Sequence, residues 1–115
     1  MKRLATTLRR RSGLILPTYE TTTAFVRGWN KLTPGQVRRF RVHLERFIED
    51  LTAMEEGRRT AFRKGLRVKK VRGANDVYEM TWASDGRAIF AVGNPSQEGK
   101  FHIVWLDIGG HEILP

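Results

Sequence analysis

The sequence predicts an α+β domain in which two N-terminal helices pack on one face of a mostly antiparallel sheet of four to five strands. Apolar residues recur every three or four positions between residues 23 and 54, which is typical of helices. Between residues 66 and 108 they fall in short β-branched and aromatic runs separated by turn residues. The expected order is one strand, two helices and a meander of strands, which groups the helices on one side of the sheet.

Composition indicates one small domain. The chain has 115 residues and no cysteine, so packing alone must hold the fold together. Residues 1–13 are basic with little apolar content and are expected to form a flexible arm, which leaves residues 14–115 as a single domain. The apolar run 14–16 is too short for a signal peptide or for a membrane-spanning helix of about 20 residues. We therefore expect a cytoplasmic protein.

The first strand and first helix follow this arm. Residues 14–23 are rich in β-branched and aromatic side chains, and Pro17 either confines this strand to a sheet edge or moves its start past the proline. Residues 23–32 place Phe25 and Trp29 one helical turn apart, which predicts a short helix with one buried face.

The second helix has the clearest boundaries. Thr33 is a suitable N-cap, Pro34 suits the first helical position and Gln36 completes a capping box. Gly57 is expected to end the helix. The buried stripe comprises Val37, Phe40, Leu44, Phe47, Leu51 and Met54. The charged residues of the opposite face, Asp50 among them, are expected to lie in solvent with weak ion pairs.

The second half of the sequence begins with a basic connector, in which we expect a turn of helix around Phe62. The remaining strands are predicted after this connector. They cover residues 66–71, 77–83, 87–92 and 101–108. Asp85 and Gly86 predict a tight hairpin turn between the second and third of these. Alternation leaves Arg87 on the face opposite Ala88, Phe90 and Val92, which could meet the helices, and it separates Glu79 from Tyr78, Met80 and Trp82. Whether the charged side chains converge depends on the strand register.

The charge is distributed in blocks. Residues 1–16 carry +5, residues 17–57 are neutral, residues 58–73 carry +8 and residues 74–115 carry −4. Two basic blocks beside an acidic remainder indicate a binding surface for a polyanion such as nucleic acid. The alternative is a disordered basic tail together with a solvated strand edge.

Two residues suit phosphate chemistry. Arg87 opens a strand at the hairpin, and its planar, permanently charged fork can stabilise a pentacoordinate phosphate, although a hairpin arginine is also a common surface residue. His111 follows two glycines that allow close backbone approach, and its titration near neutral pH suits a general acid or base as well as a purely structural role. His43 and His102 are expected to serve packing or to lie in solvent.

Metal chemistry, a phosphate-binding glycine loop and the nucleophile turn of serine hydrolases are disfavoured. The sequence has no cysteine, no histidine pair at i, i+4 and no carboxylate cluster like that of a two-metal phosphodiesterase. It also lacks a phosphate-binding glycine loop and a G-x-S-x-G turn. We expect neither a metal nor a cofactor.

Three segments carry a family resemblance: LRVKKVRGANDVYEMTW (66–82), DGRAIFAV (85–92) and VWLDIGGHEIL (104–114). With the order of elements, they make the chain resemble the RelE/ParE superfamily of bacterial type II toxins over residues 18–114. In that family a central strand opens with an arginine before an apolar run, and the last strand ends near a glycine with a basic residue or a histidine. Arg87 and His111 stand at these two positions.

The resemblance implies a metal-independent endoribonuclease that cuts mRNA, often on the ribosome, and is silenced by an antitoxin protein. RNA supplies the 2′-hydroxyl nucleophile, so the enzyme must position it, move protons and stabilise the phosphorane. Arg87 would grip the phosphate and His111 would act as base or acid, so the two residues are expected to form the two ends of one concave phosphate site. Glu79 departs from the family, some members of which carry lysines just after the aromatic residue of this strand, and it would be either a general base or a charge that repels phosphate. The residues assigned to RNA binding are Arg67, Lys69, Lys70, Arg72 and Tyr78.

Two other functions remain open on the same fold. One is a ParE-like inhibitor that binds DNA gyrase, which would cause DNA damage without transcript cleavage. The other is a non-catalytic nucleic-acid-binding protein, which would bind RNA with a steep salt dependence and leave no cleaved ends. In each case the expected protein partner is an antitoxin that covers the basic surface, with an acidic or amphipathic segment that folds on binding.

Overall fold

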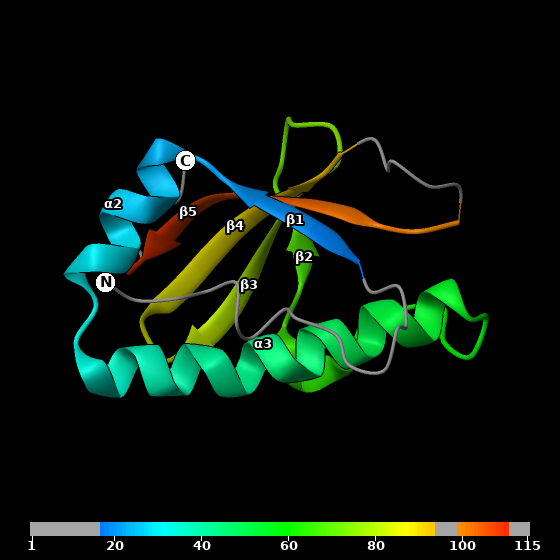
Figure 1. The fold of residues 1–115 in the computed structure, drawn as a ribbon, viewed down its shortest axis with the longest axis horizontal. Coiled ribbons are helices and arrows are strands. Elements are labelled where there is room, and N and C mark those ends of the chain that lie inside the picture. The colour runs from blue at the N-terminus through cyan, green and yellow to red at the C-terminus, as the bar shows by residue number, and fades with distance from the viewer. Residues whose placement is uncertain (1–16, 94–98, 111–115) are drawn as a thin grey trace.

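The protein forms two layers, a sheet and a pair of helices (Figure 1). The computed structural model describes residues 17–93 and 99–110. The elements are β1 (Thr18–Thr21), α2 (Thr23–Lys31), α3 (Pro34–Glu55), the 3₁₀ turn η1 (Lys64–Leu66), β2 (Lys69–Lys70), β3 (Val77–Ala83), β4 (Gly86–Val92) and β5 (His102–Gly109). The sheet order is β1-β5-β4-β3-β2, with β1 parallel to β5 and the other neighbours antiparallel. The predicted α+β fold is confirmed.

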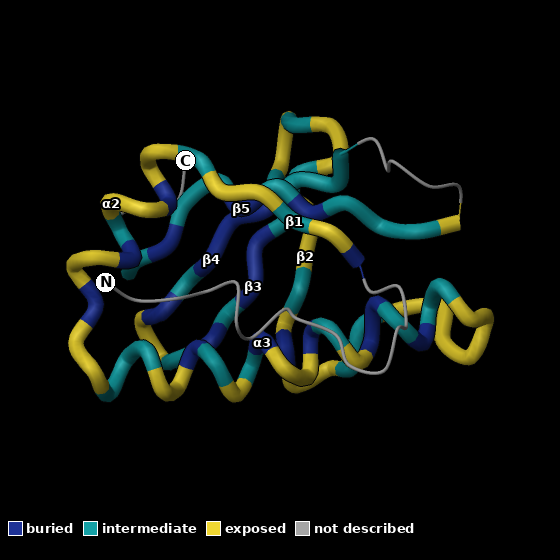
Figure 2. Tube along the Cα trace, viewed as in Figure 1, coloured by how far each residue is buried: buried dark blue, intermediate teal, exposed yellow. Residues whose placement is uncertain are grey.

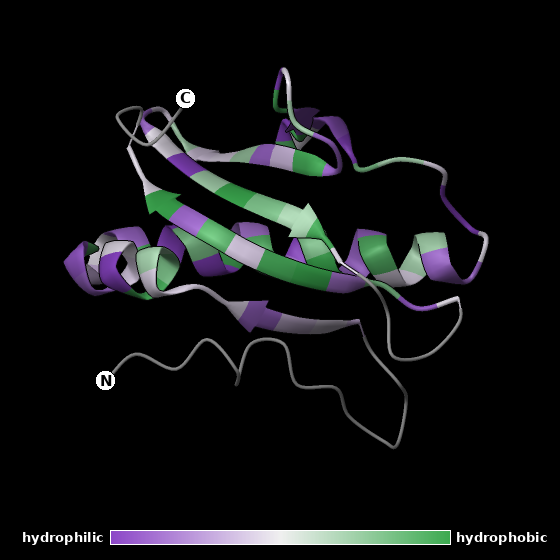
Figure 3. Cartoon of the chain, turned by 90° about the horizontal axis from the view of Figure 1, so that it is seen from above, coloured by the Kyte–Doolittle hydropathy of each residue, from purple (hydrophilic) through white to green (hydrophobic). Residues whose placement is uncertain are grey.

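The core lies between the sheet and the two helices. Met80, Trp82 and Phe90 point from β3 and β4 toward the helices and are at most 2% exposed. Phe40 of α3 stands edge-on to Trp82, with the ring centres 6.0 Å apart. Figure 2 shows the buried stretches of the central strands facing α3, and Figure 3 shows β4 and β5 as largely hydrophobic strands in front of it. The predicted alternation of faces in β3 and β4 therefore holds.

The boundaries of α3 follow from its caps. Thr33 Oγ1 accepts a hydrogen bond from the Gln36 amide at 3.2 Å, and Gln36 Oε1 accepts one from the Thr33 amide at 2.8 Å. Gly57 follows the helix with a φ of +76°, the left-handed conformation that ends many helices. In the part of the chain that is described, no helix is long and apolar enough to cross a membrane.

Helix α2 packs on β5 with no room for a side chain at Gly28. A Cβ at this position would lie 2.2 Å from the Ile108 carbonyl oxygen. The close contact explains why glycine stands inside this helix, although it is a poor helix former. The helix thereby fixes the end of β5.

Three local predictions were wrong in detail. The turn of helix lies at Lys64–Leu66 and not around Phe62. The predicted strand 66–71 is reduced to Lys69–Lys70, because Arg67 adopts a left-handed conformation with a φ of +50°. Residues 84–85 form the hairpin turn, and Gly86 already belongs to β4. A Cβ on Gly86 would lie 2.6 Å from the Trp82 ring, so packing, rather than turn geometry, requires glycine there.

Candidate nucleic-acid interface

The sheet face opposite the helices brings together three of the predicted site residues. Lys69 of β2 pairs with Glu79 of β3, which pairs in turn with Ile89 of β4. One step along the strands, Thr81 pairs with Arg87. Diagonal neighbours on adjacent strands lie about 7–8 Å apart, so Arg87 and Glu79 are neighbours on this face. We call it the outer face.

Glu79 and Lys69 form an ion pair on the outer face. The Lys69 ammonium lies 3.4 Å from Glu79 Oε1. The Glu79 side chain is 10% exposed, whereas that of Lys69 is 72% exposed. A nearly buried carboxylate therefore depends on a lysine whose other side is open to solvent and to any anionic ligand.

The Arg87 guanidinium folds back onto its own hairpin. Nη1 donates to the Gly86 carbonyl at 3.0 Å and to the Ala83 carbonyl at 3.3 Å. These bonds orient the planar fork beside the turn and satisfy carbonyl groups there. The side chain is half-buried, so part of it can reach a ligand on the outer face. The hydrogen bonds to the hairpin carbonyls hold it in place for such a ligand.

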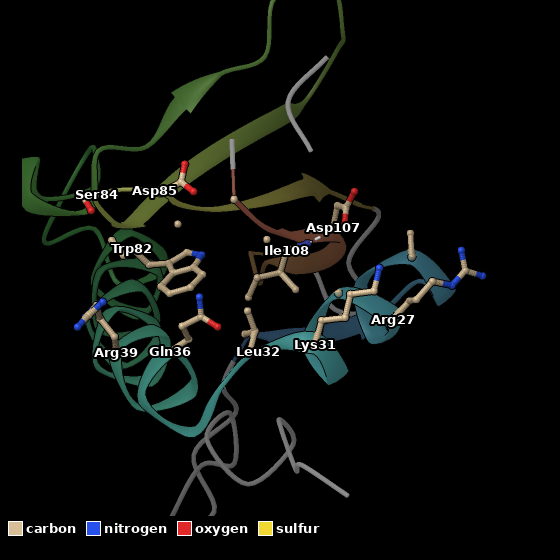
Figure 4. A pocket seen from close by; sticks show the side chains of 16 residues that line it. Arg27, Lys31, Leu32, Gln36, Arg39, Trp82, Ser84, Asp85, Asp107 and Ile108 are labelled. Atoms are coloured by element: carbon tan, nitrogen blue, oxygen red, sulfur yellow. Dashed lines mark hydrogen bonds between the residues drawn. The ribbon is translucent and has the colours of Figure 1, made fainter. Parts of the chain in front are cut away.

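The hairpin turn and the end of β5 meet at a cavity of about 650 Å³. Its walls include residues 84–86 of the hairpin, residues 107–109 of β5 and Gly110, which follows that strand. Figure 4 shows Lys31 of α2 and Arg39 of α3 on either side of Trp82 and Ile108. Arg87 pairs with Gly109, and its side chain is not among the residues that line this cavity.

His111 lies outside the described residues. The sequence reaches it directly after Gly110, which lines the cavity at the end of β5. The predicted pairing of His111 with Arg87 therefore stays a prediction.

The cations assigned to RNA binding gather near the opposite end of β3. Arg67, Lys69, Lys70 and Tyr78 line a second cavity of about 530 Å³, which we call the edge groove. It lies between the C-terminal part of α3, the connector and strands β2 to β4. Arg72 is exposed in the turn between β2 and β3 and does not line the groove. The predicted RNA-binding residues thus extend from the groove to the outer face.

A buried ion pair that the sequence analysis missed holds the basic connector in place. Asp50 was expected in solvent, but it is 1% exposed. Its carboxylate accepts hydrogen bonds at 2.8 Å from both the backbone amide and Nη2 of Arg63, and Arg59 lies 3.7 Å away. The only sequence signal was an acidic residue beside the apolar stripe, followed by a run of arginines.

The Asp50 carboxyl is kept charged by this contact. Burial by itself raises its pKa, but hydrogen bonds from the Arg63 side chain and backbone, with the charges of Arg63 and Arg59, outweigh burial and lower the pKa. The hydrogen bonds to Asp50 and Glu49 raise the pKa of Arg63. The pair fixes the path by which the chain enters the edge groove.

The two described histidines have structural partners. His102 bridges β5 and β1, with Nδ1 2.7 Å from Thr18 Oγ1 and Nε2 3.1 Å from Glu20 Oε2. His43 lies 3.0 Å from the Arg39 carbonyl on α3. Within residues 17–93 and 99–110, no three histidine, aspartate or glutamate side chains group as metal ligands would.

Solved toxin structures share this fold. The E. coli DinJ-YafQ toxin-antitoxin complex contains a chain that is 10% identical, with a TM-score of 0.63, over 87% of this chain and 98% of that one. A second structure of the E. coli DinJ-YafQ complex contains a chain that is 9% identical, with a TM-score of 0.55, over 85% of this chain and 97% of that one. A copper-bound mutant toxin from Helicobacter pylori gives 12% identity and a TM-score of 0.54 over 88% and 100%.

No protein-family model matches the sequence, and no curated protein does. The likeness is therefore one of fold. The chain has the RelE-like fold of type II toxins, as the sequence predicted.

Proposed function

We propose that this chain is the toxin of a type II toxin-antitoxin system and acts in the cytoplasm as a metal-independent endoribonuclease on mRNA. The observation that carries the proposal is the position of Arg87, Glu79 and Lys69 together on the outer face of a sheet with this fold. A carboxylate can accept the proton of the 2′-hydroxyl, and an arginine and a lysine can stabilise the negative charge that develops on the phosphate.

The reaction forms one phosphorus–oxygen bond and breaks another. The 2′-oxygen attacks the adjacent phosphorus atom and the 5′-oxygen leaves, which gives a 2′,3′-cyclic phosphate and a 5′-hydroxyl end. Either Glu79 or His111 takes the proton of the 2′-hydroxyl, and the other donates one to the leaving oxygen. The Arg87 fork donates to the phosphoryl oxygens as negative charge builds on them. RNA supplies its own nucleophile, so no metal is needed.

The Glu79–Lys69 pair gives substrate binding a role in activation. An RNA phosphate competes with Glu79 for the exposed Lys69 ammonium. When the lysine turns to the phosphate, the Glu79 carboxylate is left facing the bound RNA without its cationic partner. The remaining cations, Arg67, Lys70 and Arg72, hold the RNA backbone on either side.

An antitoxin protein is the proposed regulator, and the ribosome is the proposed place of cleavage. The similar E. coli YafQ chain is seen in complex with DinJ. The large positive charge of residues 58–73 suits both the ribosome and an acidic inhibitor.

One observation favours a second candidate function. Arg87 already donates to hairpin carbonyls, as it would in a purely structural role. A member of this fold that binds DNA gyrase or nucleic acid without cutting RNA would not need this side chain for chemistry.

Brief induction in bacteria, followed by mapping of transcript ends, tests the proposal. Wild type should arrest growth and produce new 5′-hydroxyl ends, whereas Arg87→Ala and His111→Ala should lower cleavage about 100-fold or more. The matched control is Arg38→Ala, which removes an exposed cation of α3 and should cleave as wild type does. Growth arrest with DNA damage and intact transcripts would instead indicate a gyrase inhibitor.

Purified protein completes the test. Cleavage of an RNA oligonucleotide should persist in EDTA. RNA binding without cleaved ends would indicate the non-catalytic alternative.

A further inference from the structure

The cavity between the hairpin turn and the end of β5, which we call the hairpin cavity, has the size of a small-molecule site. Its volume of about 650 Å³ lies within the usual range for such sites, about 300–1,000 Å³. Its walls come from α2, the first turns of α3, the hairpin and the end of β5. None of the described residues assigned to RNA binding or cleavage lines it.

Three cations line the hairpin cavity, Arg27 and Lys31 of α2 and Arg39 of α3. All three are exposed, and none of them forms an ion pair with another described residue. Arg27 and Lys31 stand at i, i+4 on the helix, where like charges repel each other. An anionic group in the cavity would relieve this repulsion and accept charge-assisted hydrogen bonds.

Two neutral N–H donors also lack an acceptor at this cavity. Trp82 is 2% exposed, and its Nε1 has no hydrogen-bond partner in the described chain. Figure 4 shows this nitrogen on the edge of the ring that faces Ile108, with the Gln36 amide nitrogen pointing toward it. Gln36 Oε1 already accepts from the Thr33 amide, so the end turned to Trp82 is a donor as well. Because two donors cannot satisfy each other, an acceptor atom of a ligand is the partner that both lack.

The rest of the wall suits the sugar and base of a nucleotide. Leu32 and Ile108 offer apolar surface on which a base can pack. Asp107 Oδ1 accepts a hydrogen bond from the Ile108 amide at 2.9 Å, which leaves Oδ2 to accept from a ribose hydroxyl or a base amino group. Inorganic phosphate would fill only the cationic part of a cavity of this size.

The hairpin links the cavity to Arg87. Ala83 and Gly86 line the hairpin cavity, and their carbonyl groups accept hydrogen bonds from Arg87 Nη1 at 3.3 and 3.0 Å. A ligand that packs against this turn restrains the same carbonyls that position the guanidinium. Occupation of the cavity is therefore coupled to the arginine of the outer face.

We propose that the hairpin cavity binds a free nucleoside phosphate and that this ligand regulates the outer face. The phosphate pairs with the cations of α2 and α3, acceptor atoms of the ligand meet the N–H groups of Trp82 and Gln36, and its hydroxyl or amino groups donate to Asp107. The bound ligand holds the hairpin and with it Arg87, so RNA cleavage becomes faster. This regulation rests on the proposed function, whereas the binding does not.

RNA is the other source of nucleoside phosphates. The helices that wall the cavity lie on one side of the sheet, and the outer face lies on the other. A free nucleotide and RNA should therefore bind together. If the cavity held a residue of the RNA strand, a free nucleotide would instead displace RNA.

Titration with free nucleotides tests the site. The probes are the four ribonucleoside 5′-monophosphates and the four 5′-triphosphates, and the controls are adenosine and inorganic phosphate, each of which lacks one part. Calorimetry on the full chain should give a Kd below about 1 mM for at least one nucleotide, with both controls at least about tenfold weaker. In nitrogen-15 NMR spectra the indole N–H signal of Trp82 should shift with that nucleotide, whereas those of Trp29 and Trp105 should stay. Failure of every nucleotide to bind overturns the inference.

Two charge removals locate the binding. Lys31→Gln removes a cation of the cavity and should weaken nucleotide binding about tenfold. Arg38→Gln makes the same change on an exposed part of α3 that does not line the cavity, and it should weaken binding less than about twofold. Both side chains are exposed, so both variants should fold. Equal weakening by the two changes would place the nucleotide elsewhere and overturn the inference.

Cleavage assays separate this inference from the proposed function. A saturating nucleotide should raise the cleavage rate of wild type and of Arg38→Gln about fivefold, and the same concentration should have less effect on Lys31→Gln. The inference is overturned if the nucleotide displaces RNA, or if bound nucleotide leaves the wild-type rate unchanged. Nucleotide binding by a chain that never cleaves RNA would overturn the proposed function and the regulation that rests on it, and the binding site would stand.

Discussion

The two faces of the central sheet differ in what holds their side chains. On the helix side, Trp82, Phe90 and their neighbours are buried among rings of α2 and α3. On the outer face, Arg87 bonds to hairpin carbonyls and Glu79 is buried beside an exposed lysine. The first face is fixed by packing and the second by a few polar contacts. Changes on the helix side should therefore break the fold, whereas changes on the outer face should alter function and leave the fold standing.

The largest effect is expected at the centre of the helix side. Phe40 is 0% exposed and contacts the rings of Trp29, Trp82 and Trp105. Phe40→Ala removes a buried ring and leaves a cavity, which should lower the free energy of unfolding by about 3–5 kcal/mol. Urea titration followed by tryptophan fluorescence measures this loss. A loss below about 1 kcal/mol would show that the core is packed differently.

The next effect is expected at the buried Asp50–Arg63 pair. Asp50→Asn removes the negative charge that Arg63 faces. The free energy of unfolding should fall by about 2–3 kcal/mol, and not by more, because the Arg63 side chain is 35% exposed and water can solvate its charge. The matched control is Glu49→Gln, which changes an exposed partner of the same arginine and should cost less than about 1 kcal/mol.

The same pair predicts a dependence on pH. The pKa of Asp50 is lower in the folded than in the unfolded protein, so its stabilisation is complete above the unfolded value of about 3.9. It is lost as the pH falls through the folded pKa. Unfolding titrations between pH 6 and acid should show a steeper loss in wild type than in Asp50→Asn.

A smaller effect is expected where α2 meets β5. Gly28→Ala places a Cβ against the Ile108 carbonyl oxygen, so the helix must move, at a cost of about 1–3 kcal/mol. Gly65→Ala is the control, since no atom lies within 4 Å of a Cβ there. Thermal unfolding of both variants measures the difference. Equal stability would contradict the close approach of α2 to β5.

The smallest effect on stability is expected on the outer face. A double-mutant cycle uses the variants Lys69→Met, Glu79→Gln and the two combined. The coupling free energy between the two side chains should be at most about 1 kcal/mol of stability, because Lys69 is largely exposed. Cleavage of RNA should respond far more strongly. Glu79→Gln should lower the rate about 100-fold or more if Glu79 moves a proton. An unchanged rate would remove Glu79 from the mechanism.

The contrast between the two faces of the sheet also explains which features of the structure could be predicted from the sequence. Periodic apolar residues and the Thr33 cap are local signals, so both helices, the long strands and the core face of the sheet were predictable. Arg67 is left-handed because Leu66 is buried in the core and the chain must turn there, and no local pattern reveals that. The Asp50–Arg63 contact depends equally on tertiary packing. Alternation predicted that Arg87 points away from the helices, but it did not predict the register that brings Glu79 beside Arg87, the hydrogen bonds of Arg87 to the hairpin carbonyls or the ion pair of Glu79 with Lys69.

The central claim is that the outer face cuts RNA, and paired rate and stability measurements on Arg87→Lys test it most directly. Lysine keeps the charge but lacks the planar fork that binds two phosphate oxygens. The account predicts a fall in the cleavage rate of about 100-fold, with the free energy of unfolding changed by less than about 2 kcal/mol. Cleavage at the wild-type rate by the folded variant would contradict it.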